Sequence, residues 1–395
     1  IMLTPRLKPY YNFKETLAIL NPFNKRNAIQ RFEEAFADKF DANYGTMFAH
    51  GRTGMYALFK AWNLNDDEII CPAYTCVVVQ HAIALSGNIP VFVDAAKDSW
   101  NMDYELLEKA ITSKTRCIVV THLFGYPMDV NRVNEIVKKA EEKHGHKIYQ
   151  LQDCAHSYGA KWENQLVCST GDAAIFGLNV SKVLNSIFGG MITTNSLATE
   201  IALKNWRKQH LKGNKLVKSI LRIAYYFAIR TAFLPITFAF TNWLERSGVL
   251  DRFVKYYDDN KIYFPGDWDT HPTNTEAAVG LVNLDKYDKV IEKRINNTHF
   301  YQDHFKNDNA VKFLPEIDGT TFSHCVAIVE DREAWVEKYF KKGIQLGILI
   351  EYSVPEMKAY QSFKRAEYPV AAYYAEHCIN FPNYPGLRSS DRKKI

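Results

Sequence analysis

The segment "YQLQDCAHSYGA", residues 149–160, places a carboxylate and an imidazole close together behind an apolar run. The run "HKIYQLQD" alternates in polarity and predicts a strand that ends at Asp153. A carboxylate at the carboxyl end of a strand lies where open α/β sheets bind their ligands. The alternative is that Asp153 caps the following turn and that His156 is an ordinary half-buried histidine. This segment alone does not decide between them.

A single lysine stands between two apolar strands further along the chain. Lys182 lies in "SKVLNSIFGG", after the predicted strand "DAAIFGLN" and before "MITTN". Lysine is rarely buried without a partner, and a desolvated amine has a lowered pKa and attacks carbonyl groups. The standard use of such a lysine is a Schiff base with pyridoxal phosphate, whose ring nitrogen needs an acidic partner. We interpret Asp153 as that partner, which would keep the ring protonated and electron-withdrawing.

A third motif, "HGRTGMYALF", joins a short strand to a helix through a turn flanked by glycines. Backbone N–H groups at a helix start bind anions, and Arg52 and the Thr53 hydroxyl stand beside them. The motif therefore predicts a phosphate site. The alternative is that Thr53 only caps the helix.

The elements that carry these residues alternate between strand and helix. Predicted strands include "YGTMFAH", "EIICPAY", "IPVFVDA", "TRCIVVTHLFG" and "KIYQLQD", and predicted helices separate them. This alternation favours an α/β fold in which helices sandwich a mostly parallel sheet. We predict a large cofactor-binding domain over 1–284, with an apolar insertion at about 212–260, and a smaller C-terminal α+β domain over 285–395.

Composition excludes several other classes of protein. The 395 residues are 47% hydrophobic, as in a folded globular protein, and the net charge of +5 is spread without the basic stripe of a nucleic-acid binder. The seven cysteines are scattered and form no CxxC pair. We therefore expect a reduced, cytoplasmic protein with no zinc or other metal site and no nucleic-acid partner.

Longer strings around the three motifs resemble the DegT–DnrJ–StrS family of sugar aminotransferases. They match in order and spacing from about residue 30 to 200 and from about 270 to the end. Among them are "DDEIICPAYTCVVVQHAIALSGNIPVFVDA", "QDCAHSYGA", "GDAAIFGLNVSKVLNSIFGGMITTN" and "INFPNYPGL". The resemblance implies the aspartate aminotransferase fold (fold type I), pyridoxal 5'-phosphate as cofactor and a homodimer.

The resemblance also implies a role for each motif residue. Lys182 matches the Schiff-base lysine and Asp153 the partner of the pyridinium nitrogen, while His156 matches a contact to the 3-oxygen side of the cofactor. Arg52 and Thr53 match the phosphate turn.

The chain departs from the family pattern at several positions near the cofactor. The aromatic residue that stacks on the cofactor ring is replaced by Cys76, and we take Cys76 and Tyr74 as cofactor-binding candidates. A serine that binds the phosphate is replaced by Gly177. His122 and Gly125 match the family's H-x-x-G, for which we expect a structural role.

Residues 215–244 are far more apolar than their surroundings. Lys218, Arg222 and Arg230 recur on one arc of a helix that Pro235 ends, and Lys215 falls in the same arc. The charges disfavour a transmembrane span. Two interpretations remain open: the apolar face packs on protein, or the helix contacts the inner face of a membrane with its basic residues toward anionic headgroups.

The combined prediction is an aminotransferase that converts a keto-sugar to an amino-sugar. The family resemblance implies that the sugar is nucleotide-linked and that glutamate is the amino donor. Such a reaction belongs to amino-sugar or cell-envelope glycan biosynthesis. The alternative is a non-catalytic sensor or scaffold on the same fold. The family also contains sugar dehydratases with histidine in place of the lysine, and Lys182 argues against that class.

Overall fold

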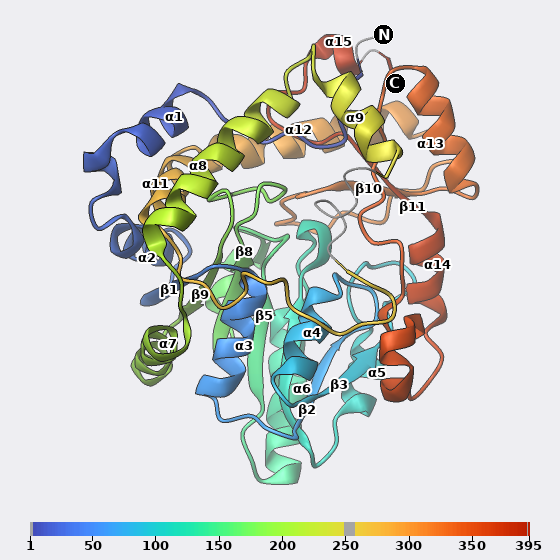
Figure 1. Ribbon diagram of the computed structural model, residues 1–395. Coiled ribbons are helices and arrows are strands. Elements are labelled where there is room, and N and C mark those ends of the chain that lie inside the picture. The colour runs from blue at the N-terminus through green and yellow to red at the C-terminus, as the bar shows by residue number, and fades with distance from the viewer. Residues whose placement is uncertain (1–2, 249–256, 393) are drawn as a thin grey trace.

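A seven-stranded sheet forms the centre of the computed structural model, which describes residues 3–248, 257–392 and 394–395 (Figure 1). In sheet order its strands are β1 (Tyr44–Phe48), β9 (Gly190–Thr194), β8 (Ala173–Gly177), β5 (Tyr149–Asp153), β4 (Thr115–Thr121), β2 (Glu68–Pro72) and β3 (Ile89–Val93). The pairs from β8 to β3 are parallel, and β9 runs antiparallel to both of its neighbours. The prediction of a mostly parallel α/β sheet is confirmed.

Helices cover both faces of this sheet because successive strand residues point to opposite sides. Ile69 and Val119 face a layer formed by α3 (Gly51–Ala61), α4 (Val78–Leu85) and α7 (Leu197–His210). Ile70 and Val120 face α5 (Tyr104–Ala110) and α6 (Val130–His144). On the same side, β8 packs against α2 (Ala28–Lys39) and α11 (Asn274–Asp285). Strands buried on both faces explain the near-continuous apolar runs of the sequence.

A smaller α+β region follows α11. It contains α12 (Tyr287–Phe305), α13 (Arg332–Lys341), α14 (Pro369–His377), and the antiparallel pair β10 (Cys325–Ile328) and β11 (Cys378–Phe381). Its core includes Tyr301 and Phe305, whose rings stack on Phe381 at centroid distances of 4.9 and 5.2 Å. The predicted domain boundary after residue 284 stays a prediction.

The predicted apolar insertion begins with two helices, α8 (Lys215–Ala232) and α9 (Phe238–Arg246), separated at Pro235. Residues 249–256 of the predicted insertion lie outside the described part of the chain. Within the described part, no helix combines the length and the apolar character that a membrane crossing needs.

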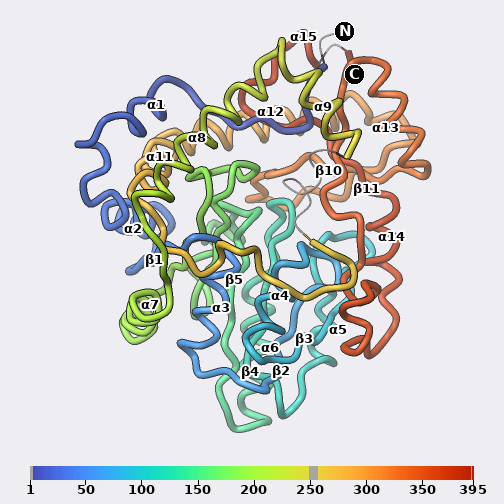
Figure 2. Tube along the Cα trace, in the orientation of Figure 1, coloured from blue at the N-terminus to red at the C-terminus, as the bar shows by residue number. Residues whose placement is uncertain are grey.

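The two ends of the chain lie side by side (Figure 2). The Thr4 hydroxyl donates to Asp391, and the Thr4 backbone bridges to Ile344. Between this anchor and α1 (Phe13–Leu20), the N-terminal segment crosses the molecule beside α12. This course brings residues 7–10 close to the loop that joins β8 to β9.

His122, just past the end of β4, has the structural role expected of it. Its Nδ1 accepts the N–H of Met128 at 2.9 Å, so Nε2 donates to the side-chain oxygen of Gln152, also at 2.9 Å. The bond from Met128 needs an unprotonated Nδ1. Burial lowers the pKa of His122 to about 4, although the bond to Gln152 acts in the opposite direction.

We expect His122→Asn to flatten the dependence of stability on pH. Below about pH 6.5 the unfolded chain binds a proton that the folded His122 does not, so the free energy of unfolding falls as pH falls from 6.5 toward 4. His122 contributes about 3 kcal/mol of this loss. Asparagine keeps an acceptor for the Met128 N–H but does not titrate. Urea unfolding from pH 7 to pH 4 measures both slopes, and equal slopes would contradict this role.

Candidate active site

Asp153 ends β5, as predicted, and its carboxylate is held in one orientation. Oδ2 accepts the Thr121 hydroxyl at 3.2 Å, and Oδ1 accepts the backbone N–H of Ala155 at 3.1 Å. The side chain is buried, which raises its pKa, while these two donors and the nearby Lys182 amine act in the opposite direction. The carboxylate is therefore positioned to pair with a cationic group in the pocket.

Lys182 lies in the loop that joins β8 to β9. Burial is the largest influence on its amine and lowers the pKa. Arg52 acts in the same direction, whereas Cys76 and Asp153 oppose it. The side chain passes over Gly177, where a Cβ would lie 3.2 Å from Lys182 Cε. The site thus holds a desolvated amine that loses its proton more easily than an ordinary lysine.

His156 presents one ring nitrogen with no partner. Its Nδ1 is buried and has no hydrogen bond within the described residues. Burial, with smaller effects from Lys182 and His324, lowers the pKa of His156 well below its usual value, so the ring is neutral. The ring stacks on Phe124 at 5.8 Å with an angle of 13° between planes. Phe124 reaches this position through a left-handed backbone conformation with φ of 57°.

The predicted phosphate turn lies at the start of α3, directly against the sheet. A Cβ on Gly190 would lie 2.4 Å from Gly51 Cα, so only glycine permits this approach. The Thr53 hydroxyl donates to the Trp268 carbonyl at 2.7 Å. Arg52 is near enough to influence Lys182. Phosphate binding by Arg52 and Thr53 stays a prediction.

The two residues proposed to replace the stacking aromatic lie in different surroundings. Cys76 is half-buried and near the Lys182 amine. Tyr74 is fully buried, its ring meets Phe124 edge-on at 6.3 Å, and its hydroxyl donates to the Ile350 carbonyl at 3.4 Å. The role of either residue toward the cofactor stays a prediction, and the geometry favours Cys76.

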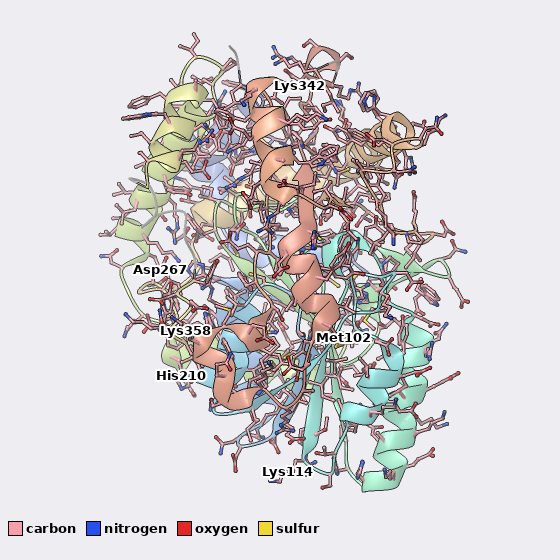
Figure 3. The ribbon with its side chains drawn as sticks, turned by 90° about the vertical axis from the view of Figure 1, so that its right-hand side faces the viewer. Met102, Lys114, His210, Asp267, Lys342 and Lys358 are labelled. Atoms are coloured by element: carbon pink, nitrogen blue, oxygen red, sulfur yellow. The ribbon has the colours of Figure 1, made fainter. Side chains whose placement is uncertain are left out.

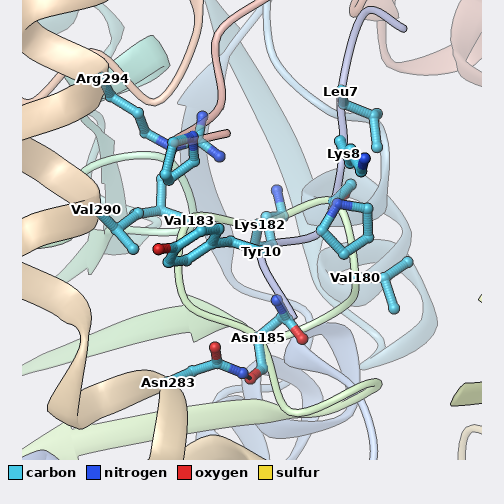
Figure 4. Close-up of a pocket in the computed structure, with 13 residues that line it drawn as sticks. Leu7, Lys8, Tyr10, Val180, Lys182, Val183, Asn185, Asn283, Val290 and Arg294 are labelled. Carbon is cyan, nitrogen blue, oxygen red and sulfur yellow. Dashed lines mark hydrogen bonds between the residues drawn. The ribbon is translucent and has the colours of Figure 1, made fainter. Parts of the chain in front are cut away.

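Sequence analysis missed the other walls of the pocket around Lys182 (Figure 4). Lys8 and Tyr10 come from the N-terminal segment, Asn185 from the β8–β9 loop and Arg294 from α12. Arg294 is buried and donates to the carbonyls of Ser323 and Asn383, while its Nε has no partner among the described residues. Nothing in the local sequence marked these positions.

The residues at this site fit pyridoxal phosphate. A buried carboxylate, a desolvated amine and an unpartnered imidazole nitrogen converge at the carboxyl ends of β5 and β8. A pocket that collects these three groups suits a ligand with an aldehyde, a basic ring nitrogen and a hydrogen-bonding oxygen.

The sequence pattern of the DegT/DnrJ/EryC1/StrS aminotransferase family matches residues 14–225 and 252–395. The chain belongs to this family. The GDP-perosamine synthase of Escherichia coli O157:H7 is 26% identical over 392 residues, which cover 98% of this chain and 92% of that protein. The dTDP-3-amino-3,6-dideoxy-alpha-D-galactopyranose transaminase of Aneurinibacillus thermoaerophilus is 25% identical and covers 93% and 88%, respectively.

Solved structures share the fold. The PLP form of Spr1654 from Streptococcus pneumoniae superposes with a TM-score of 0.77 at 20% identity, covering 100% of this chain and 96% of that one. The chain is thus an aminotransferase, and its cofactor is pyridoxal phosphate. These two predictions and the predicted family are confirmed. The family pattern leaves residues 226–251 of this aminotransferase unmatched.

Proposed function

We propose that this aminotransferase transfers an amino group from glutamate to a keto-sugar carried on a nucleotide. The observation that carries the proposal is the closeness of the buried Lys182 amine to Asp153 and His156, each of which it influences electrostatically. Two relatives with matches along nearly the whole chain are named for GDP-linked and dTDP-linked amino-sugars. Their names support a nucleotide-linked substrate and amino-sugar or cell-envelope glycan biosynthesis.

Each residue has a distinct task in this proposal. Lys182 Nζ would hold the cofactor covalently, and as a free amine it would take a proton from the donor's α-carbon and return one to the sugar carbon. Asp153 would hold a proton on the ring nitrogen of the cofactor. The bound cofactor supplies an electron sink for the carbon that loses its proton. Neutral His156, whose Nδ1 has no partner among the described residues, would hydrogen-bond the oxygen on the cofactor ring.

The basic residues around the pocket match the anionic parts of cofactor and substrate. Arg52 stands at the start of α3, and Lys8 and Arg294 line the pocket on its other sides. We assign Arg52 with Thr53 to the cofactor phosphate, and Lys8 and Arg294 to the donor carboxylate or the sugar diphosphate, since cations at these positions offset anionic charge.

A homodimer is part of the proposal and follows from the family resemblance. One exposed apolar face suits it: Phe13, Leu17 and Leu20 recur along α1 and are 68%, 45% and 58% exposed. Light scattering is expected to give twice the 45.5 kDa of one chain. A monomer at micromolar concentration would contradict this part.

A coupled assay tests the function. We expect pure protein with pyridoxal phosphate and glutamate to form 2-oxoglutarate and an amino-sugar from GDP-linked or dTDP-linked keto-sugars, detected by mass spectrometry. Glutamine and alanine serve as competing donors. If 2-oxoglutarate forms but no keto-sugar is aminated, the proposed acceptor is wrong while the donor half-reaction stands.

A further inference from the structure

The charged face of α8 is turned toward the protein. Arg222 binds Glu276 at 2.7 Å and Asp267 at 3.0 Å, and Lys218 donates to the His271 carbonyl at 2.7 Å. Glu276 is fully buried, so these cations satisfy a charge that has no access to water. The hypothesis that Lys218 and Arg222 point toward lipid headgroups is therefore wrong, because both side chains point into the protein.

The opposite face of α8 and the segment after it form one exposed apolar surface, which we call the outer stripe. Its residues recur at helical spacing on α8 and continue through the turn into α9: Leu216, Val217, Ile220, Leu221, Phe227, Leu234, Ile236, Phe240 and Trp243. Ile236 is 92% exposed and Trp243 is 60% exposed. In Figure 3 the two helices form the outer edge of the molecule, on the side of Asp267. Monomeric proteins rarely expose so continuous an apolar face without a partner for it.

Exposed cations lie at both ends of the outer stripe. Lys212 and Lys215 stand at the start of α8, and Arg246 stands at the end of α9. Lys212 also pairs with Asp269 at 2.7 Å, and Arg246 lies over the Phe340 ring at 4.1 Å. Arg230 donates to Thr16 and Tyr226 and so faces the protein. The single acidic residue of segment 212–246 is Glu245, whose carboxylate binds Arg6 at 2.8 Å. The outer stripe thus combines exposed apolar side chains, the aromatic rings of Phe240 and Trp243 on α9, and basic side chains at its two ends. This combination of groups binds anionic lipid surfaces.

We propose that the outer stripe docks this enzyme on an anionic lipid surface, with α8 and α9 lying in the plane of the headgroups. The inward ion pairs of Arg222 fix the helix to the protein and keep the stripe facing out. The proposal concerns where the enzyme binds and does not depend on the sugar substrate.

Two observations favour lipid over a second copy of the chain. The family pattern matches α8 as far as residue 225 and leaves 226–251 unmatched. An interface shared by the family therefore does not account for the part of the outer stripe that runs from Phe227 to Trp243. A two-fold contact through the outer stripe would also bring its basic side chains near those of the other copy, which costs energy. An anionic bilayer would bury the apolar side chains of the outer stripe and would pair its headgroups with the neighbouring basic side chains.

Vesicle flotation of the cofactor-loaded enzyme tests the proposal. We expect wild-type protein to float with vesicles of phosphatidylcholine containing a quarter phosphatidylglycerol, and at least tenfold less with phosphatidylcholine alone. Ile236→Ser/Phe240→Ser should lower the floating fraction at least tenfold. The matched control Leu197→Ser/Ile201→Ser removes two exposed apolar side chains from α7, which are 55% and 51% exposed, and should float like wild type.

Charge is tested separately with Lys215→Glu/Arg246→Glu, which should remove the preference for phosphatidylglycerol while leaving the mass in light scattering unchanged. Wild-type protein that stays in the bottom fraction with both vesicle types overturns the proposal. If, in addition, Ile236→Ser/Phe240→Ser halves the mass in solution, the outer stripe is an interface between copies.

Discussion

Lys182→Ala is expected to abolish amino transfer, with turnover reduced by about four to six orders of magnitude. The variant loses the covalent attachment of the cofactor and also the base that moves the proton. General acid–base catalysis alone contributes about two to four orders. The total corresponds to about 5–8 kcal/mol of activation free energy. Single-turnover kinetics with saturating cofactor measures it.

Two controls separate chemistry from folding for Lys182→Ala. Lys208→Ala changes an exposed lysine on α7 and should keep wild-type turnover. Added methylamine should restore part of the activity of Lys182→Ala, since a small amine fits the space left by the side chain and replaces the lost base. Turnover of Lys182→Ala above a hundredth of the wild-type value would show that another group carries the reaction.

Asp153→Asn is expected to keep the cofactor attached to Lys182 and to slow turnover by about two to four orders of magnitude, or about 3–5 kcal/mol. The amide has the shape of the carboxylate and its oxygen still accepts from Thr121 or Ala155. It carries no charge to hold a proton on the ring nitrogen, so the electron sink is weakened. Steady-state turnover and cofactor absorbance measure the two effects.

Thr121→Val is the matched control for Asp153→Asn, because it removes one hydrogen bond to the carboxylate and leaves the charge. Its turnover should fall by about tenfold, the equivalent of one hydrogen bond. Near wild-type turnover in Asp153→Asn would mean that Asp153 does not pair with the ring nitrogen.

The parts of the fold that sequence predicted are those set by local pattern. The apolar run that ends at Asp153 correctly predicted the last residue of β5. The position of Lys182 between two apolar segments correctly predicted that it lies in the loop between β8 and β9. Parallel strands end at one edge of the sheet, so both residues had to meet there.

The missed features depend on contacts between residues far apart in the chain. Lys8 and Arg294 reach the pocket only because the N-terminal segment crosses the molecule beside α12. A helical wheel separated the two faces of α8 correctly. It could not show which face the protein covers, because that choice is set by the buried carboxylate of Glu276 on another helix.

Borohydride trapping tests the central claim most directly, because reduction makes the bond between cofactor and lysine permanent. Protein saturated with pyridoxal phosphate is reduced, digested and mapped by mass spectrometry. We predict a single pyridoxyl label on Lys182, and none when the cofactor is first converted to its amine form by excess glutamate. A label on another lysine, such as Lys8 in the same pocket, or no label on saturated protein, would contradict the account.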